Sequence, residues 1–372
     1  MSSFILICAL SWFGFSQQPA DTTARFNRAV QLQRQGALKE AGAEYRALLT
    51  DKPDYLEALA NFGSVLSRLG EYDEAVGVYE RALKLAPDHP QLLLNLGIAH
   101  HRAGHFEKAA LTLDRAVALS PETVQARQLL GISLVELGRD LEAVSHLEKS
   151  LSNSPGDPAV LYSLGLAYLR LNRPELMNIV EQLARTPAGI AASHLLKGQS
   201  LLASHEYERS IVELEQAAKL DSNLPRLQYS FGLALLKLGR NKEAITSFER
   251  ELVRTPLDFT TLYYLAYLHE ADGNTEPALE RLNAALKIQS ESPEANALLG
   301  KLLVKQNKPA EALRPLEYAV KNDPKDPDKR YLLARVYQQM GRREDAAREF
   351  AEVQRLKDEQ LKGDRARTPK PN

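Results

Sequence analysis

The stretch "LGEYDEAVGVYERALKLAPDHP" at residues 69–90 decides the fold. It starts at the glycine that ends one helix, continues as an amphipathic helix, and closes at a proline. Thirty-four residues later, "AGHFEKAALTLDRAVALSPETV" at residues 103–124 follows the same plan with different side chains. A fixed spacing of this length indicates a chain built from one structural unit that is used many times.

Small residues mark the unit along the whole chain. A glycine or alanine in the first helix recurs every 33 or 34 residues at Ala29, Gly63, Gly97, Gly131, Gly165, Gly198, Gly232, Ala266, Gly300 and Ala334. Twelve residues further on, a second small series falls at Ala41, Ala75, Ala109, Ala143, Ser210, Ala244, Ala278, Ala312 and Ala346. Small side chains in register let two helix axes approach each other closely.

Large side chains and helix-ending residues complete the unit. A large apolar residue follows the second small one at Tyr45, Tyr79, Leu113, Leu147, Leu214, Phe248, Leu282, Leu316 and Phe350. Residues that tolerate the left-handed conformation separate the two helices at Gly36, Gly70, Gly104, Gly138, Asn172, Gly239, Gly273, Asn307 and Gly341. Each unit is therefore predicted to be two antiparallel helices joined by a tight turn. Such pairs stack, because one pair alone cannot bury its apolar face.

These spacings resemble the tetratricopeptide repeat, and residues 61–90 are a near-consensus copy of it. About ten copies cover residues 22–360, with units that start near residues 22, 56, 90, 124, 158, 191, 225, 259, 293 and 327. The resemblance implies an all-α fold, a right-handed α-solenoid of stacked helix pairs. The early aromatic that is often found in the family's first helix is absent here.

One unit departs from the pattern. The stretch "LNRPELMNIVEQLARTPAGIAA" at residues 171–192 lacks one residue near the turn, so Leu176, Val180 and Leu183 fill the small, large and small positions. Two interpretations stay open. Repacking can absorb the deletion without consequence, or the bulkier contacts can bend the array and separate two sub-arrays.

The two ends of the sequence differ from the repeats. Residues 4–15, "FILICALSWFGF", are an apolar run that is too short to span a bilayer, which needs about 20 residues. It fits the core of a signal peptide at residues 1–16, followed by a linker at 17–21, although no basic residue precedes it. The alternatives are an uncleaved membrane anchor and a helix packed on the first repeat. A charged second helix in the last unit fits a terminal cap, and residues 361–372 are predicted to be a disordered tail.

Composition excludes several classes of function. The formal net charge is −1, which gives no general attraction to nucleic acid. Neither a phosphate-binding glycine loop nor a Gly-x-Ser-x-Gly motif is found, and the single cysteine, Cys8, lies inside the apolar run. His100, His101 and His105 flank a turn and are interpreted as surface histidines rather than metal ligands. We therefore predict no enzyme activity, no metal and no cofactor.

The family resemblance implies that the first helices line a concave groove, which assigns candidate partner-binding residues. One row is Asn27, Asn61 and Asn95, whose amides could hold a peptide backbone. A basic row, suited to partner carboxylates, includes Arg34, Arg68, Arg102, Arg170 and Lys237. An apolar and aromatic middle includes Tyr162, Tyr229, Tyr263, Tyr264 and Tyr267. The alternatives to partner binding are that Asn and basic residues are common at these positions throughout the family, and that some of the apolar residues pack against the next unit.

The prediction from sequence is an exported, non-enzymatic scaffold that binds a protein or peptide in its groove, secreted or periplasmic, with no nucleic-acid partner. A membrane-tethered assembly or accessory factor of an envelope or secretion complex is the alternative if the leader stays attached.

Overall fold

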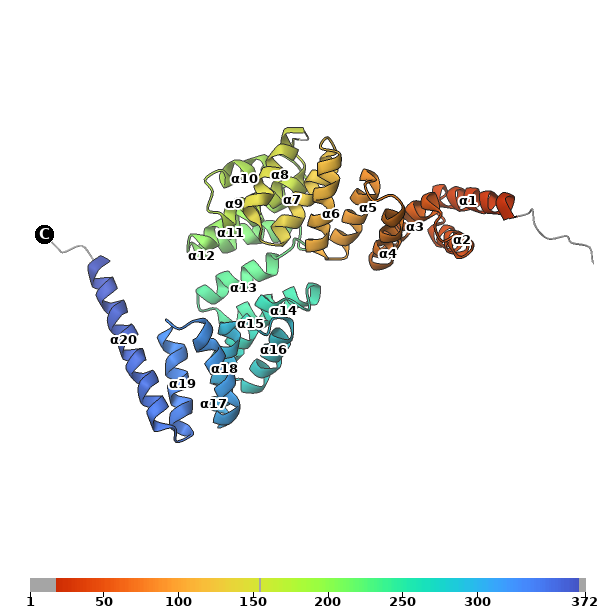
Figure 1. Cartoon of the computed structure of the whole chain (residues 1–372). Coiled ribbons are helices and arrows are strands. Elements are labelled where there is room, and N and C mark those ends of the chain that lie inside the picture. The colour runs from red at the N-terminus through yellow and green to blue at the C-terminus, as the bar shows by residue number, and fades with distance from the viewer. Residues whose placement is uncertain (1–17, 154, 368–372) are drawn as a thin grey trace, which may run out of the picture. The chain divides into compact units, whose positions relative to one another are not determined.

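The computed structural model describes residues 18–153 and 155–367. These residues form twenty α-helices and contain no strand, so the prediction of an all-α chain is confirmed (Figure 1). From α1 to α10 and from α12 to α20, each helix packs against the next one along the chain, which gives stacked helix pairs. The predicted signal peptide at residues 1–16 lies outside the described residues. Within the described part, no helix is both long and apolar enough to cross a membrane.

The chain divides into two compact units, residues 1–196 and 197–372, and the division falls within α11. The helices of the first unit are α1 Gln18–Arg34, α2 Leu38–Asp51, α3 Leu56–Leu69, α4 Tyr72–Leu85, α5 Pro90–Arg102, α6 Phe106–Leu119, α7 Val124–Glu136, α8 Asp140–Asn153, α9 Pro158–Arg170 and α10 Leu176–Ala184. Helix α11, Ile190–Ala203, carries residues of both units.

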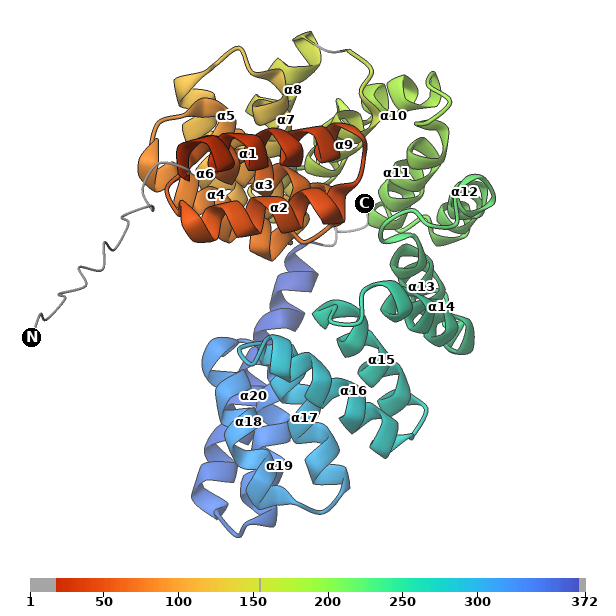
Figure 2. The ribbon, with the colours of Figure 1, turned by 90° about the vertical axis from the view of Figure 1, so that its right-hand side faces the viewer.

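The helices of the second unit after α11 are α12 Tyr207–Leu220, α13 Leu227–Lys237, α14 Asn241–Arg254, α15 Phe259–Ala271, α16 Thr275–Ile288, α17 Pro293–Lys305, α18 Pro309–Asn322, α19 Pro327–Gln339 and α20 Arg343–Arg367. Figure 2 shows them following one another from green to blue. In each pair the odd-numbered helix is called the first helix and the even-numbered one the second.

The turns within pairs form where the sequence places glycine or asparagine. Gly70 ends α3 with a φ of 82°, and its N–H donates to the carbonyl oxygen of Leu66. Asn172 and Asn307 adopt the same left-handed conformation with φ of 51° and 59°. His205, with a φ of 65°, takes this place in the sixth pair, which the sequence pattern did not predict.

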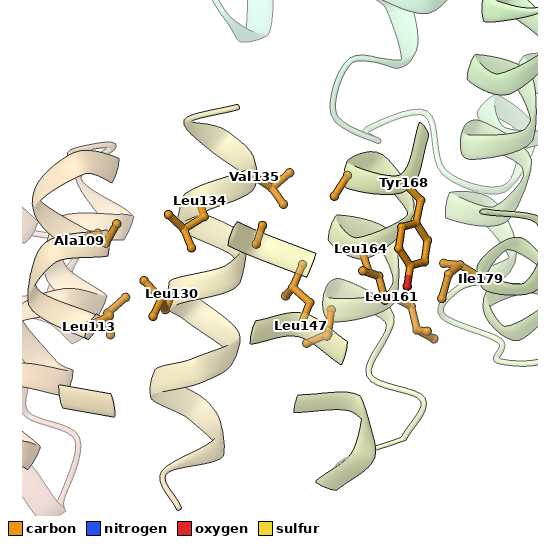
Figure 3. Packing of buried hydrophobic residues seen from close by; sticks show 14 of the residues in the cluster. Ala109, Leu113, Leu130, Leu134, Val135, Leu147, Leu161, Leu164, Tyr168 and Ile179 are labelled. Atoms are coloured by element: carbon orange, nitrogen blue, oxygen red, sulfur yellow. The ribbon is translucent and has the colours of Figure 1, made fainter. Parts of the chain in front are cut away.

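Close approach between paired helices depends on the small residue of the first helix. A Cβ added at Gly131 would lie 2.6 Å from Leu147, the large residue of the same pair. Leu147 is fully buried in a cluster with Leu130, Leu134 and Leu164 (Figure 3). A side chain at position 131 would therefore overpack the contact, and Gly131→Leu should cost about 1–3 kcal/mol of unfolding free energy.

The atypical fifth pair solves this contact differently. Helix α10 has only nine residues, and Leu176, Val180 and Leu183 are all buried, as its amphipathic pattern requires. The side chain closest to Gly165, however, is Leu196 of α11, which a Cβ at Gly165 would meet at 2.5 Å. The large residue of this contact thus comes from α11, the first helix of the following pair. The second compact unit begins at the next residue, 197.

Both ends of the array extend further as helix than the sequence suggested. Helix α1 begins at Gln18, so residues 18–21 belong to it and not to a linker. Pro19 stands in its first turn, where proline is well tolerated. Helix α20 continues to Arg367, through residues 361–367 that were assigned to the tail. Gly363 alone costs only about 1 kcal/mol relative to alanine and does not end a helix of strong helix formers.

Candidate partner-binding surfaces

Successive first helices contact each other in the first unit and in the later part of the second. In the first unit α1, α3, α5, α7 and α9 are neighbours in that order, and in the second α15, α17 and α19 are. Side chains one repeat apart therefore lie on adjacent helices and face the same side. We call these the first-helix surface of the first unit and the first-helix surface of the second unit.

The asparagine row lies on the first-helix surface of the first unit. Asn27 is exposed, whereas Asn61 and Asn95 are partly buried. Asn61 hydrogen bonds with the hydroxyl of Tyr45, and Asn95 accepts a hydrogen bond of 3.0 Å from Gln91. Part of the hydrogen-bonding capacity of this row is therefore used within the protein itself.

The side chains of the basic row differ in whether they form hydrogen bonds and ion pairs within the protein. Among the described residues, Arg68, Arg102 and Lys237 are exposed and have no ion-pair partner. Arg170 instead donates to the main-chain oxygen of Val135 at 2.7 Å and to Asp140 at 3.2 Å. It joins neighbouring pairs, so it is a packing residue as much as a candidate contact for a partner.

Most of the predicted aromatic middle belongs to the packing of the protein. Tyr162 lies against the core of the first unit, half-buried. In the second unit Tyr264 stacks on the buried ring of Phe248 with a centroid distance of 5.6 Å. Tyr229 contacts the same Phe248 ring and lies under the guanidinium of Arg226, 3.6 Å from the ring centroid. Burial raises the pKa of Tyr229 to about 12.

Tyr263 and Tyr267 differ although they are one helical turn apart. Tyr263 stacks on Phe259 at 6.3 Å and packs on the core of the second unit, and burial raises its pKa to about 12. Tyr267 is 42% exposed. Of the tyrosines predicted in α13 and α15, Tyr267 is therefore the one whose side chain is most available to a partner.

Sequence reasoning missed several exposed residues of the same surface. Tyr331 on α19 is 44% exposed, and Arg335 is exposed without an ion-pair partner among the described residues. Lys301 and Lys305 on α17 both contact Glu270 on α15. The 34-residue step would have found two of them, because it leads from Tyr267 to Lys301 and on to Arg335.

The three histidines around Gly104 do not converge on one point. His100 is 2% exposed, and its Nδ1 has no hydrogen-bond partner among the residues that the structure describes. His101 Nδ1 lies 3.0 Å from the Ser133 hydroxyl, while His105 Nε2 lies 3.7 Å from Asp73. Within residues 18–153 and 155–367, no group of three or more His, Cys, Asp or Glu side chains is placed to hold a metal ion.

Comparison with known proteins agrees with this architecture. A family model described as tetratricopeptide repeat matches residues 61–124, 128–176, 195–259 and 229–293, more than half of the chain. The chain belongs to the tetratricopeptide repeat family. A further model, of anaphase-promoting complex, cyclosome, subunit 3, matches residues 271–353.

Individual relatives of this tetratricopeptide repeat chain are distant. Anaphase-promoting complex subunit 3 of Schizosaccharomyces pombe is 25% identical over 158 residues, which are 42% of this chain and 24% of that protein. The chain thus spans about a quarter of the length of that relative. Among solved structures, yeast Tom70 is 15% identical with a TM-score of 0.40, covering 91% of this chain and 93% of its own. MamA is 24% identical with a TM-score of 0.41, covering 43% of this chain and 88% of its own.

Proposed function

We propose that this tetratricopeptide repeat chain is a non-catalytic scaffold that binds a protein or peptide segment on its first-helix surfaces. The observation that carries the proposal is the first-helix surface of the second unit. It presents the half-exposed rings of Tyr267 and Tyr331 beside cations that have no ion-pair partner there, such as Arg335. Tyrosine and arginine are enriched where proteins bind one another, because each combines contact area with hydrogen bonding.

The name of a matched relative also supports a protein partner. The S. pombe relative is, by its name, a subunit of a protein complex. We extend this to the present chain and propose that it also binds other proteins. The formal net charge of −1 disfavours nucleic acid, whose binding depends on many phosphate contacts from basic residues.

We also propose that the scaffold is exported, secreted or periplasmic, with residues 1–16 as its signal peptide. The apolar run at residues 4–15 supports this. A membrane-tethered accessory factor of an envelope or secretion complex is the second candidate if the run is retained as an anchor. The intact mass of the chain recovered from its host separates the two, since cleavage removes the run.

The test of partner binding uses two paired variants of the full chain. Tyr267→Ala with Tyr331→Ala removes the exposed rings, while Val253→Ala with Leu257→Ala removes apolar side chains that are 82% and 76% exposed on and after the second helix α14. Proteins captured from the host by the wild-type chain are identified, and the affinity of a captured partner is then measured with each variant.

We expect the tyrosine pair to weaken that partner at least about tenfold, because buried aromatic anchors carry much of the binding energy of an interface. The control pair should leave the affinity unchanged, and both should unfold at the wild-type urea midpoint. Equal affinities for the wild-type chain and the tyrosine variant would show that binding does not use this surface.

A further inference from the structure

Half of the histidines of this chain lie in or beside one helix, α5. The sequence holds eight histidines, and the four at α5 are His89, His100, His101 and His105. His89 directly precedes the helix, His100 and His101 stand in its last turn, and His105 follows the turn after it. The others occur one at a time, as His146, His194, His205 and His269. Because histidine changes its charge between about pH 5 and 8, α5 concentrates groups that respond to mild acid.

His89 caps the start of α5 with its imidazole ring. The Nδ1 atom of His89 accepts a hydrogen bond of 3.4 Å from the main-chain N–H of Leu92. Only a neutral imidazole can accept in this way, because both ring nitrogens carry a proton in the charged form. The positive charge would also be unfavourable at a helix N-terminus. Equivalent helices are capped by side chains that keep accepting in mild acid, such as Asp157 before α9 and Ser292 before α17.

His100 occupies an apolar position at the other end of α5. Leu66 and Leu134 hold the equivalent positions one repeat before and one repeat after it, and both are buried. The ring of His100 is likewise buried, and its unpartnered Nδ1 is described above. A charged imidazole at this position would lose its hydration without gaining a hydrogen-bond partner at Nδ1, which is costly.

His101 is half-buried in the contact between α5 and the helices that follow it. Its ring packs edge-on against Phe106 of α6 with a centroid distance of 5.4 Å, and it reaches the Ser133 hydroxyl of α7. Burial, the largest cause, lowers the pKa of His101, and the adjacent Arg102 lowers it further. His100 and His101 therefore both favour the neutral form while α5 is packed.

The charged groups around these rings come from the neighbouring helices. Glu80 and Asp73 of α4 favour protonation of His100, whereas His105 and Lys108 at the start of α6 disfavour it. The last turns of α3 and α7, which also contact α5, carry Arg68 and Glu136, and Asp88 beside His89 pairs with Arg115 of α6. Carboxylate, lysine and arginine side chains keep their charge between pH 7.5 and 5.5. Of these groups, the histidines are the ones that change.

His105 makes the one contact of this group that acid strengthens. Its Nε2 lies 3.7 Å from a carboxylate oxygen of Asp73, so a charged His105 is attracted to α4. The His105 ring centroid, however, is 5.8 Å from that of His100. A positive charge on His105 therefore makes protonation of the packed His100 less favourable.

We propose that α5 is an acid-sensitive element of the array, which opens locally when His89, His100 and His101 take up protons. The open form exposes these imidazoles and binds more protons than the packed form, so a falling pH favours opening. The effect is local because a repeat array is held by contacts between neighbouring units. Opening takes Asn95 and Arg102 out of the first-helix surface of the first unit. The inference goes beyond the proposed function and holds whether or not a partner binds there.

Hydrogen–deuterium exchange of the full chain at pH 7.5 and 5.5, followed by mass spectrometry, tests the proposal. The rates are corrected for the intrinsic pH dependence of amide exchange, so that they report how often each helix opens. We expect α5 to open at least about tenfold more often at pH 5.5, since each imidazole shielded from protons contributes up to about tenfold per pH unit. Helix α17, which contains no histidine, should change little.

A triple variant assigns the effect to the histidines with residues that the repeat already uses. The substitutions are His89→Asp, His100→Leu and His101→Val, which copy Asp157, Leu134 and Val135 from equivalent positions. We expect α5 of this variant to open equally often at both pH values.

The matched control removes histidines from the second unit in the same way. His205→Asn copies the left-handed Asn307, and His269→Leu copies Leu303 one repeat later. The acid opening of α5 in this variant should equal that of the wild-type chain.

His89→Asp alone tests the cap without touching a buried side chain, so it does not depend on whether the triple variant folds. It should reduce the opening of α5 at pH 5.5, because aspartate still accepts from Leu92 there.

Three outcomes would overturn the proposal. They are equal opening of wild-type α5 at the two pH values, an equal increase in α5 and α17, and a wild-type increase in the triple variant. Each concerns the packing of α5 in the absence of a partner, so the proposed function is decided separately by the captured partner and the tyrosine variants.

Discussion

At the scale of single residues, glycines of this chain serve two different purposes. Gly63 in α3 stands where a Cβ would lie 2.6 Å from the ring of Tyr79. Gly77 in α4 is also helical, but a Cβ there would meet nothing within 4 Å. The same substitution should therefore have opposite effects at the two positions.

We expect Gly63→Ala to destabilise the protein by about 1–3 kcal/mol, because the contact becomes overpacked. Gly77→Ala should stabilise it by about 0.5–1 kcal/mol, since alanine loses less backbone entropy in a helix. Urea unfolding of both variants measures the two changes. Loss of stability at Gly77 or a neutral result at Gly63 would contradict this account of the helix contacts.

His100 provides a prediction for pH. Burial, the largest cause, lowers its pKa below the ordinary value of 6.5. The negative charge of Glu80 acts in the opposite direction, and His105 lowers the pKa of His100 further. The folded state therefore binds fewer protons at this site than the unfolded state. The contribution of neutral His100 to the free energy of unfolding is fully present above pH 6.5. It should be lost progressively as the pH drops from 6.5 through the lowered pKa.

The measurement compares urea midpoints at pH 7.5 and 5.5 for the wild-type chain and for His100→Leu. His101 and His146 also have pKa values lowered by burial, so the wild-type slope contains their contributions too. The variant should show a smaller loss of stability between the two pH values. An equal loss in both proteins would mean that His100 is readily protonated in the folded state.

At the scale of helices, the fifth pair shows how a neighbouring helix can supply a packing contact that the pair itself lacks. Its second helix, α10, is short, and Leu196 of α11 fills the contact with Gly165 that a second helix fills in pairs such as α7 and α8. Leu196 has no exposed surface. The side chain is thus shared between neighbouring pairs rather than within one.

Leu196→Ala should cost about 2–5 kcal/mol of unfolding free energy, because it leaves a cavity in the core. Met177→Ala on α10, where the methionine is 47% exposed, serves as the control and should stay within about 0.5 kcal/mol of wild type. Denaturant unfolding measures both. A small effect at Leu196 would indicate that α10 itself can close the contact.

Helix pairs were the part of the fold most open to prediction. Turn residues such as Gly70 and Asn307 and the small residues at 34-residue steps act over short stretches of chain, so their effect can be read locally. The left-handed conformation of His205 was not predicted, because histidine is not a strong indicator of such a turn, although the repeat spacing points to this position. Helix ends at Gln18 and Arg367 escaped because no strong breaker marks residue 21 or 361.

At the scale of the whole molecule, candidate binding residues separated into packing and surface only after folding. Tyr264 and Tyr267 are three residues apart in one helix, yet one stacks on Phe248 and the other is 42% exposed. Their fates depend on what the neighbouring helices bring opposite them. Arg170 likewise looked free in the sequence but reaches back to Val135 of the preceding pair.

The sequence was sufficient to establish the repeat, the all-α class and the partner of each helix within its pair, because each of these depends on residues close together in the chain. Tertiary packing settled which side chains stay accessible and which charges meet. Glu270 joins Lys301 and Lys305 across 31 and 35 residues, and their net charge exists only where α15 and α17 lie side by side. Burial and pairing are properties of neighbours in space, and a repeat pattern specifies the spacing of those neighbours but not their exposure.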